Sequence, residues 1–269
     1  MRILSWPVVT GETLGWALAL VLLMAGGCRD AGSAQLIEGY TALEQSRYDE
    51  AMAAAERYLA DDPPGRSVAE ALYLRGRAIE SRVKQNDGEA VAHLRRAQAD
   101  YQRALTLSPG KRLETYIYTS LGNVCFWLGD CSTAASYWKE AYQRLDREDL
   151  RGWVLFRIGL CQQRMGQWID ADGTFAAVQQ EFAGSDAAEA ARAHQGARAF
   201  YVQVAAFQTV SSADRVVAEL RSKGLPALAQ DRPARRLRVV LVGPLNTYAE
   251  AQAMRVRVAG QYKDAMIVP

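Results

Sequence analysis

Two histidines, four cysteines and a cluster of arginines are the side chains here whose types could support chemistry. The histidines, His93 and His194, lie far apart in the sequence, and we expect each to be a surface residue. No HExxH, GxSxG or P-loop motif occurs. The carboxylates are scattered over predicted helix faces, so no pair stands out for glycoside hydrolysis. We therefore expect no catalytic residue and no cofactor, and predict that the protein is not an enzyme.

Three of the cysteines, Cys125, Cys131 and Cys161, lack the C-x-x-C spacing of a zinc site. No metal site is predicted. Two interpretations remain for these residues. They pack as small apolar side chains, or Cys125 pairs with Cys131 across a helical turn in an oxidising compartment.

Positive charge is concentrated at the carboxyl end. From Phe200 onward there are ten Lys and Arg against five Asp and Glu, whereas residues 28–199 carry 21 basic and 24 acidic residues. Arginine binds carboxylates bidentately, so the cluster fits either a carboxylate-binding site or a solvated loop that aids solubility. No nucleic-acid partner is predicted. The cluster comprises Arg232, Arg235, Arg236 and Arg238.

The elements that must position these arginines follow from the apolar pattern. The stretch "FYVQVAAF" alternates with period two and predicts a strand over 200–207. A helix capped by Ser211 or Ser212 and stopped by Gly224 follows. The segments "PALAQD", "RLRVVLVGP" and "AMIVP" predict three more strands, and a capping box of Thr247 and Glu250 starts a second helix before the last of them. This βαββαβ order predicts a ferredoxin-like fold with both helices on one sheet face.

The segments "YVQVAAF" (201–207), "ADRVVAELRSKGLPA" (213–227) and "VLVGPLNTYAEAQAM" (240–254) resemble the SPOR domain of bacterial envelope proteins. The resemblance implies binding to peptidoglycan glycan strands that have lost their stem peptides. Alternation directs four valines (202, 204, 240 and 242) toward the helices and leaves the other sheet face bare. That face could stack on sugar rings, or dock on the repeat region or on a protein partner. The predicted glycan contacts are Gln203, Ala205, Val239, Leu241, Arg235, Arg236 and Arg238.

Between Cys28 and Phe200 the sequence repeats itself. Four glycines stand inside helical patterns, where glycine costs about 1 kcal/mol relative to alanine, so a close approach must require them. Small residues follow twelve positions later, and Trp138 or Phe175 follows sixteen positions later. In the second copy the matching residues, Tyr101 among them, stand nine positions too far along, which predicts a longer loop or an extended helix. The glycines are Gly39, Gly76, Gly122 and Gly159.

This pattern resembles the tetratricopeptide repeat, most clearly in "YTSLGNVCFWLGDCSTAASYWKEA" and "LFRIGLCQQRMGQWIDADGTFAAV". Residues 187–199 are predicted to form a cap helix. The resemblance implies a helical array that either binds protein partners in a groove or serves chiefly as a spacer. The tyrosines that could line the groove, or instead belong to the core, are Tyr40, Tyr73, Tyr116 and Tyr118.

At the amino end, "TLGWALALVLLMA" (13–25) has the length of a signal-peptide core. The following "AGGC" resembles a bacterial lipobox, which would make Cys28 the lipid-bearing first residue of the mature chain. Arg29 at the next position is compatible with sorting to the periplasmic face of the outer membrane. The alternatives are a plain signal peptide or an uncleaved anchor.

The sequence thus predicts four parts: a lipoprotein signal peptide (1–27), a lipidated tether (28–33), tetratricopeptide-like repeats with a cap helix (34–199) and a SPOR domain (200–269). The last two are joined with almost no linker, so we expect them to move together. The predicted function is a cell-envelope lipoprotein that binds denuded glycan and scaffolds protein partners in cell division or wall remodelling. The alternative is an envelope assembly or amidase-regulating factor whose SPOR domain is only structural.

Overall fold

The computed structural model describes residues 31–61, 66–83, 90–232 and 236–269. These residues form two compact units, and the boundary between Val154 and Leu155 falls inside helix α8 (Glu148–Arg164). The predicted signal peptide and Cys28 lie outside the described residues. Within the described residues, none of the helices is both long and apolar enough to span a bilayer.

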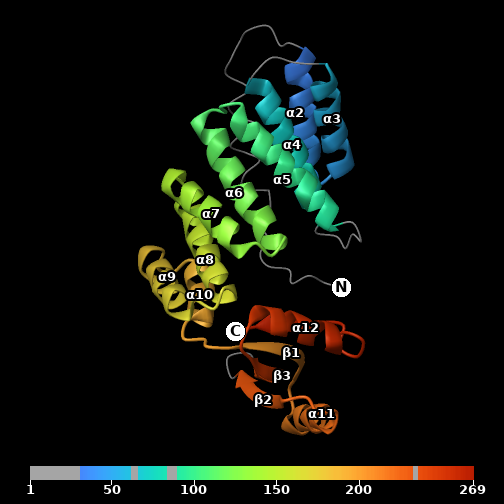
Figure 1. Ribbon diagram of the computed structural model, residues 1–269, viewed down its shortest axis with the longest axis vertical. Helices are drawn as coiled ribbons and strands as arrows, with labels where there is room; N and C mark the ends of the chain where they lie inside the picture. The colour runs from blue at the N-terminus through green and yellow to red at the C-terminus, as the bar shows by residue number, and fades with distance from the viewer. Residues whose placement is uncertain (1–30, 62–65, 84–89, 233–235) are drawn as a thin grey trace. The chain divides into compact units, whose positions relative to one another are not determined.

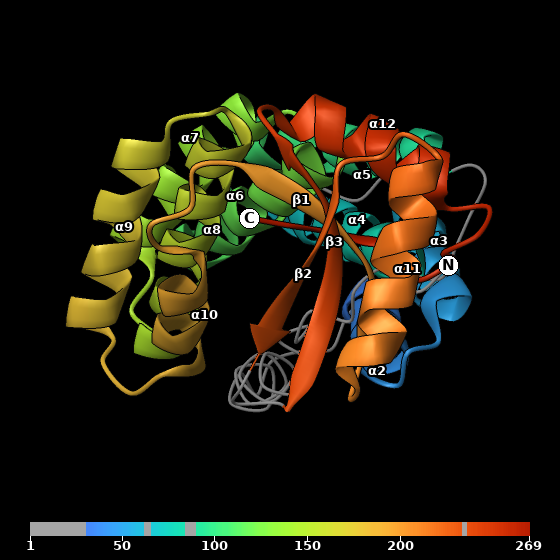
Figure 2. The ribbon, with the colours of Figure 1, turned by 90° about the horizontal axis from the view of Figure 1, so that it is seen from below.

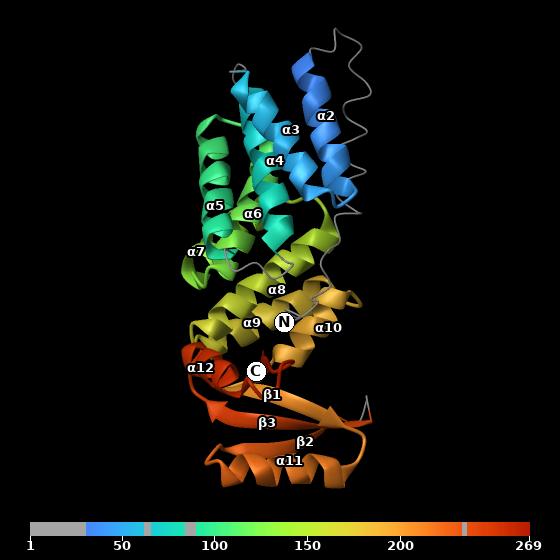
Figure 3. The same ribbon diagram turned by 90° about the vertical axis from the view of Figure 1, so that its right-hand side faces the viewer.

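The first unit is built from antiparallel helix pairs, drawn from blue to green in Figure 1. Figure 3 shows α2 to α5 lying side by side as rods, and neighbouring helices in the sequence are also neighbours in space. The pairs are α2 (Ala31–Glu44) with α3 (Tyr48–Ala60), α4 (Arg66–Val83) with α5 (Ala90–Thr106), and α6 (Lys111–Trp127) with α7 (Cys131–Arg144).

Three of the helical glycines lie against an aromatic ring of the partner helix, whereas Gly39 lies closest to Leu74 of α4. A Cβ placed on Gly122 would lie 2.3 Å from the Trp138 indole, and one on Gly76 would lie 2.6 Å from the Tyr101 ring. The contact with Tyr101 confirms that the second pair contains nine additional residues. Part of this insertion extends α4, which reaches Val83.

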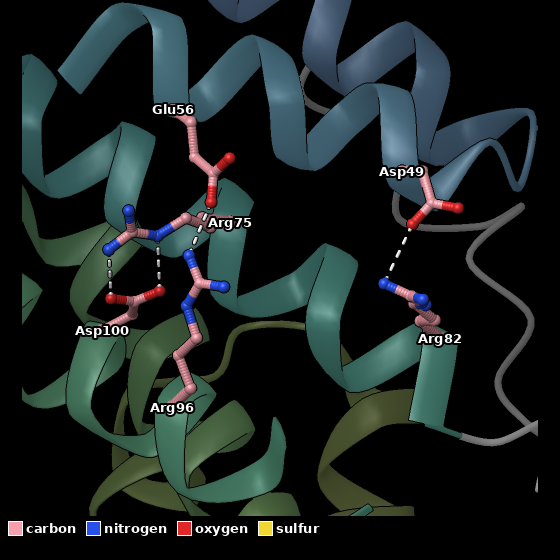
Figure 4. A network of polar contacts seen from close by, with 6 residues as sticks. All are labelled: Asp49, Glu56, Arg75, Arg82, Arg96 and Asp100. Carbon is pink, nitrogen blue, oxygen red and sulfur yellow. Dashed lines mark hydrogen bonds and ion pairs between the residues drawn. The ribbon is translucent and has the colours of Figure 1, made fainter. Parts of the chain in front are cut away.

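Ion pairs link helices α3, α4 and α5, as Figure 4 shows: one joins the two helices of the second pair, and two join that pair to α3. Arg75 of α4 donates two hydrogen bonds to Asp100 of α5, at 2.8 and 2.6 Å, and their side chains are 18% and 8% exposed. The pairs Arg96–Glu56 (2.5 Å) and Arg82–Asp49 (3.1 Å) are more exposed. Of these three pairs, Arg75–Asp100 is the best shielded from water, so breaking it should cost most.

The second unit begins with the rest of α8 and continues with α9 (Trp168–Glu181) and the cap helix α10 (Asp186–His194). The cap is shorter than predicted, because Gly196 has a φ of +80° and ends the helical region before β1.

His194 is not the surface residue that the sequence suggested. Its ring lies against Phe156 and Phe175, with ring centroids 5.5 and 5.7 Å away. The Gln163 side chain is 2.9 Å from both His194 Nδ1 and the His194 carbonyl oxygen. Burial lowers the pKa of His194 from 6.5 to about 4, because the apolar pocket disfavours the charged form.

The carboxyl-terminal part is a four-stranded antiparallel sheet with the predicted βαββαβ order. Its strands are β1 (Phe200–Phe207), β2 (Ala227–Arg232), β3 (Leu237–Leu245) and β4 (Met266–Val268), arranged as β2-β3-β1-β4. Helices α11 (Val210–Ser222) and α12 (Tyr248–Val258) cover the same face, which Figure 2 shows at the right of the strands.

The two helix starts test the predicted caps. Thr247 accepts from the Glu250 N–H at 3.1 Å, which confirms Thr247 as the N-cap of α12. The Glu250 carboxylate accepts from the N–H of Asn246, one residue before the N-cap, at 2.9 Å, so the reciprocal half of the predicted capping box is displaced by one residue. The prediction for α11 is wrong, since its N-cap is Thr209. Ser212 is already inside the helix and accepts a hydrogen bond from Thr209 Oγ1 at 2.8 Å.

Within the second unit, the sheet is joined to the last repeat by aromatic contacts. The ring centroids of Trp168 in α9 and Phe200 in β1 are 4.9 Å apart, and Phe200 in turn meets Tyr248 of α12 at 5.5 Å. The Arg164 guanidinium lies 4.3 Å from the Tyr248 ring centroid. Trp168 therefore packs against the apolar core between the sheet and its helices.

Candidate functional site

The candidate site is the sheet face opposite α11 and α12, which we call the outer face. Val202, Val240 and Val242 belong to the core beneath the helices, so their neighbours in each strand point the other way. Strand register places aromatic, amide and cationic side chains together on this face. Its half-buried or exposed members include Tyr201, Gln203, Leu228, Gln230 and Arg232.

Gln203 is on the outer face as predicted, but Ala205 is not. A bulge between Gln203 and Ala205 shifts the pairing, so that Gln203 faces Leu241 whereas Ala205 faces Val240. Ala205 then packs against the core beneath the helices. An added residue in one strand reverses the direction of the side chains beyond it, which is why simple alternation fails here.

Val239 and Leu241 are on the predicted side of β3 but are not accessible. They are only 4% and 2% exposed. Strand β3 has a partner on each side, and Leu241 stands between Leu228 and Gln203 in the register. The prediction that these two side chains form an open apolar surface is therefore wrong, and flanking residues provide the accessible part of the face.

Arg238 belongs to the helix side of the sheet, which corrects its predicted place among the glycan contacts. Its guanidinium bridges Asp231 of β2 at 2.9 Å and Asp214 of α11 at 3.5 Å. The hydrogen bond to Asp231 raises the pKa of Arg238 above its ordinary value. Arg238 thus ties α11 to the sheet, with its charge balanced by two carboxylates.

The remaining arginines of the cluster differ in placement. Arg232 is exposed at the end of edge strand β2, where alternation from Leu228 and Gln230 puts it on the outer face. Arg236 is exposed, with a φ of 51°, in the connection to β3. Arg235 lies outside the described residues. Arg232 is therefore the cation that the structure places beside the amides of the face.

Tyr201 was absent from the sequence-based site, although its alternation with Val202 could have identified it. The structure positions its ring over Gly243 of β3, because a Cβ on Gly243 would lie 2.8 Å from Tyr201 Cδ1. Gly243 has a φ of +148°, which a side chain would strain. Because Gly243 has no side chain, the Tyr201 ring can lie directly against the backbone of β3 on the outer face.

In the repeats, the tyrosines singled out from the sequence are largely structural. Tyr73 is buried beside Tyr101, with ring centroids 5.9 Å apart, while Tyr40, Tyr116 and Tyr118 are half-buried. Tyr101 donates to the buried Glu80 carboxylate at 2.9 Å. Burial is the largest cause of the raised pKa of Tyr101, so this phenol stays neutral.

Cys125, Cys131 and Cys161 are buried and form no disulfide, which agrees with the packing interpretation. Burial raises the pKa of Cys125 to about 11, so it is an unreactive thiol at neutral pH. The described residues contain no group of His, Cys, Asp and Glu arranged to hold a metal ion.

Comparison with protein families agrees with this architecture. The family described as SPOR domain matches residues 196–269, and a tetratricopeptide repeat family matches residues 153–185. No curated protein matches. The crystal structure of the apo form of RapI is similar with a TM-score of 0.45 and 12% identity over 64% of this chain. The alignment spans 63% of the RapI chain.

Both matching families are binding modules, and no catalytic family is among them. A SPOR domain implies peptidoglycan binding and a location in the cell envelope, and tetratricopeptide repeats imply interactions with proteins. The chain therefore consists of a tetratricopeptide repeat region followed by a carboxyl-terminal SPOR domain.

Proposed function

We propose that this protein is a non-enzymatic envelope lipoprotein that binds denuded glycan strands through the outer face and scaffolds protein partners through its repeats. Its role is in cell division or wall remodelling. The observation that carries the proposal is the composition of the outer face. An aromatic ring, two amides and a guanidinium share the side of the sheet that the domain's helices leave uncovered, namely Tyr201, Gln203, Gln230 and Arg232.

These groups suit a glycan without stem peptides. Loss of the peptide leaves a lactyl carboxylate on alternate sugars, and the Arg232 guanidinium can bind it through two hydrogen bonds. The amides of Gln203 and Gln230 both donate and accept, as sugar hydroxyls and acetamido groups require. The Tyr201 ring offers an apolar surface to a sugar ring and a hydroxyl for hydrogen bonding.

A sacculus pull-down tests this proposal. The full-length protein should be enriched on amidase-treated sacculi relative to intact sacculi, and the double variant Tyr201→Ala with Arg232→Glu should lose that enrichment. Arg215→Glu is the matched control, because Arg215 is exposed on α11 in the layer behind the sheet. Equal retention of the outer-face and control variants would refute the proposed face.

The membrane attachment is a separate element of the proposal. Cys28 would carry the lipid and hold the protein at the periplasmic face of the outer membrane. Metabolic labelling with a radioactive fatty acid should label the wild type and not a Cys28→Ser variant. Labelling of both chains would exclude Cys28 as the acylated residue.

One observation favours the alternative in which the SPOR domain is structural. Trp168 of the last repeat packs against the core of the sheet, so the domain also covers the end of the helical array. If it serves only as such a cap for an assembly or amidase-regulating factor, the wild-type protein should not distinguish treated from intact sacculi.

A further inference from the structure

A second candidate binding site lies in the repeat region, far in sequence from the outer face. It is a cleft of about 820 Å³ between the first turns of α6 and the connection from α7 to α8. Four cationic side chains line it: Lys111 and Arg112 from α6, and Arg144 and Arg147 from the other wall. We call it the basic cleft.

Among the side chains that line the basic cleft, cations outnumber carboxylates. Glu114 and Asp146 also line it, which leaves an excess of two positive charges. Arg144 is held by Glu140 at 2.5 Å and Arg147 by Asp149 at 2.7 Å, both outside the lining. Such exposed pairs are weak, so the guanidiniums are oriented by these partners and can still engage another anion.

The start of α6 adds to the positive potential. Its N-cap is Gly110, which makes no side-chain cap hydrogen bond to the first turn. The early N–H groups of a helix have no partner within the helix, and the helix dipole places partial positive charge there. Lys111 and Arg112, which are both exposed, extend this potential into the cleft.

The lining of the cleft also has aromatic and apolar parts, which a small anion would not contact. Tyr116 and the buried Leu145 are part of the lining, so an occupant meets an aromatic ring and apolar carbon beside the cations. Arg112 Nε donates to the Tyr116 hydroxyl at 3.3 Å, which joins the aromatic and cationic parts of the wall. A chain of several residues with carboxylates and some apolar contact fits this lining better than a single ion.

We propose that the basic cleft binds an acidic peptide segment of a protein partner. This inference rests on the proposed role of the repeats in binding proteins and specifies the chemistry of the partner. Association should weaken with salt, because exposed charges on both sides are screened.

The test uses a fluorescein-labelled hexaglutamate peptide and the purified full-length protein in a fluorescence anisotropy titration. We expect saturable binding that weakens at least tenfold in the Lys111→Glu, Arg112→Glu double variant, whereas Lys139→Glu binds as the wild type does. Lys139 is a matched control because it is exposed on α7 outside the cleft. A hexaglutamine peptide should not bind.

A second variant, Lys111→Gln, keeps the experiment interpretable should the double variant unfold, as circular dichroism would show. It should weaken hexaglutamate binding several-fold. Absence of binding to wild-type protein, equal loss in Lys139→Glu, or displacement by equimolar phosphate would overturn the proposal. The sacculus experiment uses another ligand and other residues, so either proposal can fail without the other.

Discussion

The clearest test of the repeat packing compares two glycines of one helix pair, Gly159 in α8 and Gly173 in α9. A Cβ on Gly159 would lie 2.5 Å from Phe175 Cε1, whereas a Cβ on Gly173 would meet no atom within 4 Å. Replacing each by alanine gives the same chemical change, with the same gain in helix propensity of up to about 1 kcal/mol. Only the surroundings of the new methyl group differ.

The magnitude follows from the fixed position of the Phe175 ring. Phe175 is 0% exposed and its ring is packed against Phe156 and His194, so it cannot turn away from an added methyl group. Overpacking of this kind costs about 1–3 kcal/mol. With the full propensity gain, Gly159→Ala should therefore be destabilised by up to about 2 kcal/mol, and Gly173→Ala should be stabilised by up to about 1 kcal/mol.

The assay is chemical denaturation, with hydrogen exchange of α8 and α9 to assign the change to this helix pair. Because the propensity gain is common to both, the two variants should differ by the overpacking cost of about 1–3 kcal/mol in the free energy of unfolding, with Gly159→Ala the less stable. If both variants were stabilised equally, the close approach at Gly159 would not be the reason for glycine there, and the explanation of the repeated glycines would be wrong.

Three further predictions concern ionisation and packing. The free energy of unfolding, measured by chemical denaturation, should fall by about 2 kcal/mol from pH 7 to pH 5. The reason is that His194 takes up a proton in the unfolded chain but not in the folded chain, where its pKa is about 4. The same loss in a His194→Asn variant would contradict this. Asp100→Ala should lower the free energy of unfolding in urea by roughly 3 kcal/mol, because it leaves the Arg75 charge largely buried and without its partner. Asp49→Ala, at an exposed pair, should lower it by less than about 1 kcal/mol. Similar losses in the two variants would count against the burial argument. Trp168→Ala should increase hydrogen exchange in β1 as well as in α9, because the indole packs on the sheet core, and exchange changed in α9 alone would show that the contact is not stabilising.

The periodic features of the sequence were sufficient to predict the architecture. The sixteen-residue separation of Gly122 from Trp138 and of Gly159 from Phe175 reports a contact across one helical hairpin, and both contacts are present. The βαββαβ order and the Thr247 N-cap likewise depend on residues close in sequence. Features of this kind depend on local structure, so they can be predicted from the sequence without knowledge of the tertiary fold.

The site depended on information that no local pattern contains. The bulge that turns Ala205 inward appears only when β1 pairs with β3. Arg238 was grouped with its sequence neighbours, yet its direction is determined by Asp214 and Asp231. Leu241 is only 2% exposed in a central strand, although alternation alone places it on the face away from the helices. Each error arose where strand register or a distant partner decides what a side chain contacts.

Because the Trp168 indole packs against the sheet domain, residue 200 is an unfavourable starting point for a recombinant fragment that contains this domain alone. A recombinant fragment that starts there would lack a ring that completes its interior, and its exposed Phe200 would favour aggregation. A transferable tag for labelling cell walls should therefore start upstream of α8, so that Arg164 and Trp168 are both retained.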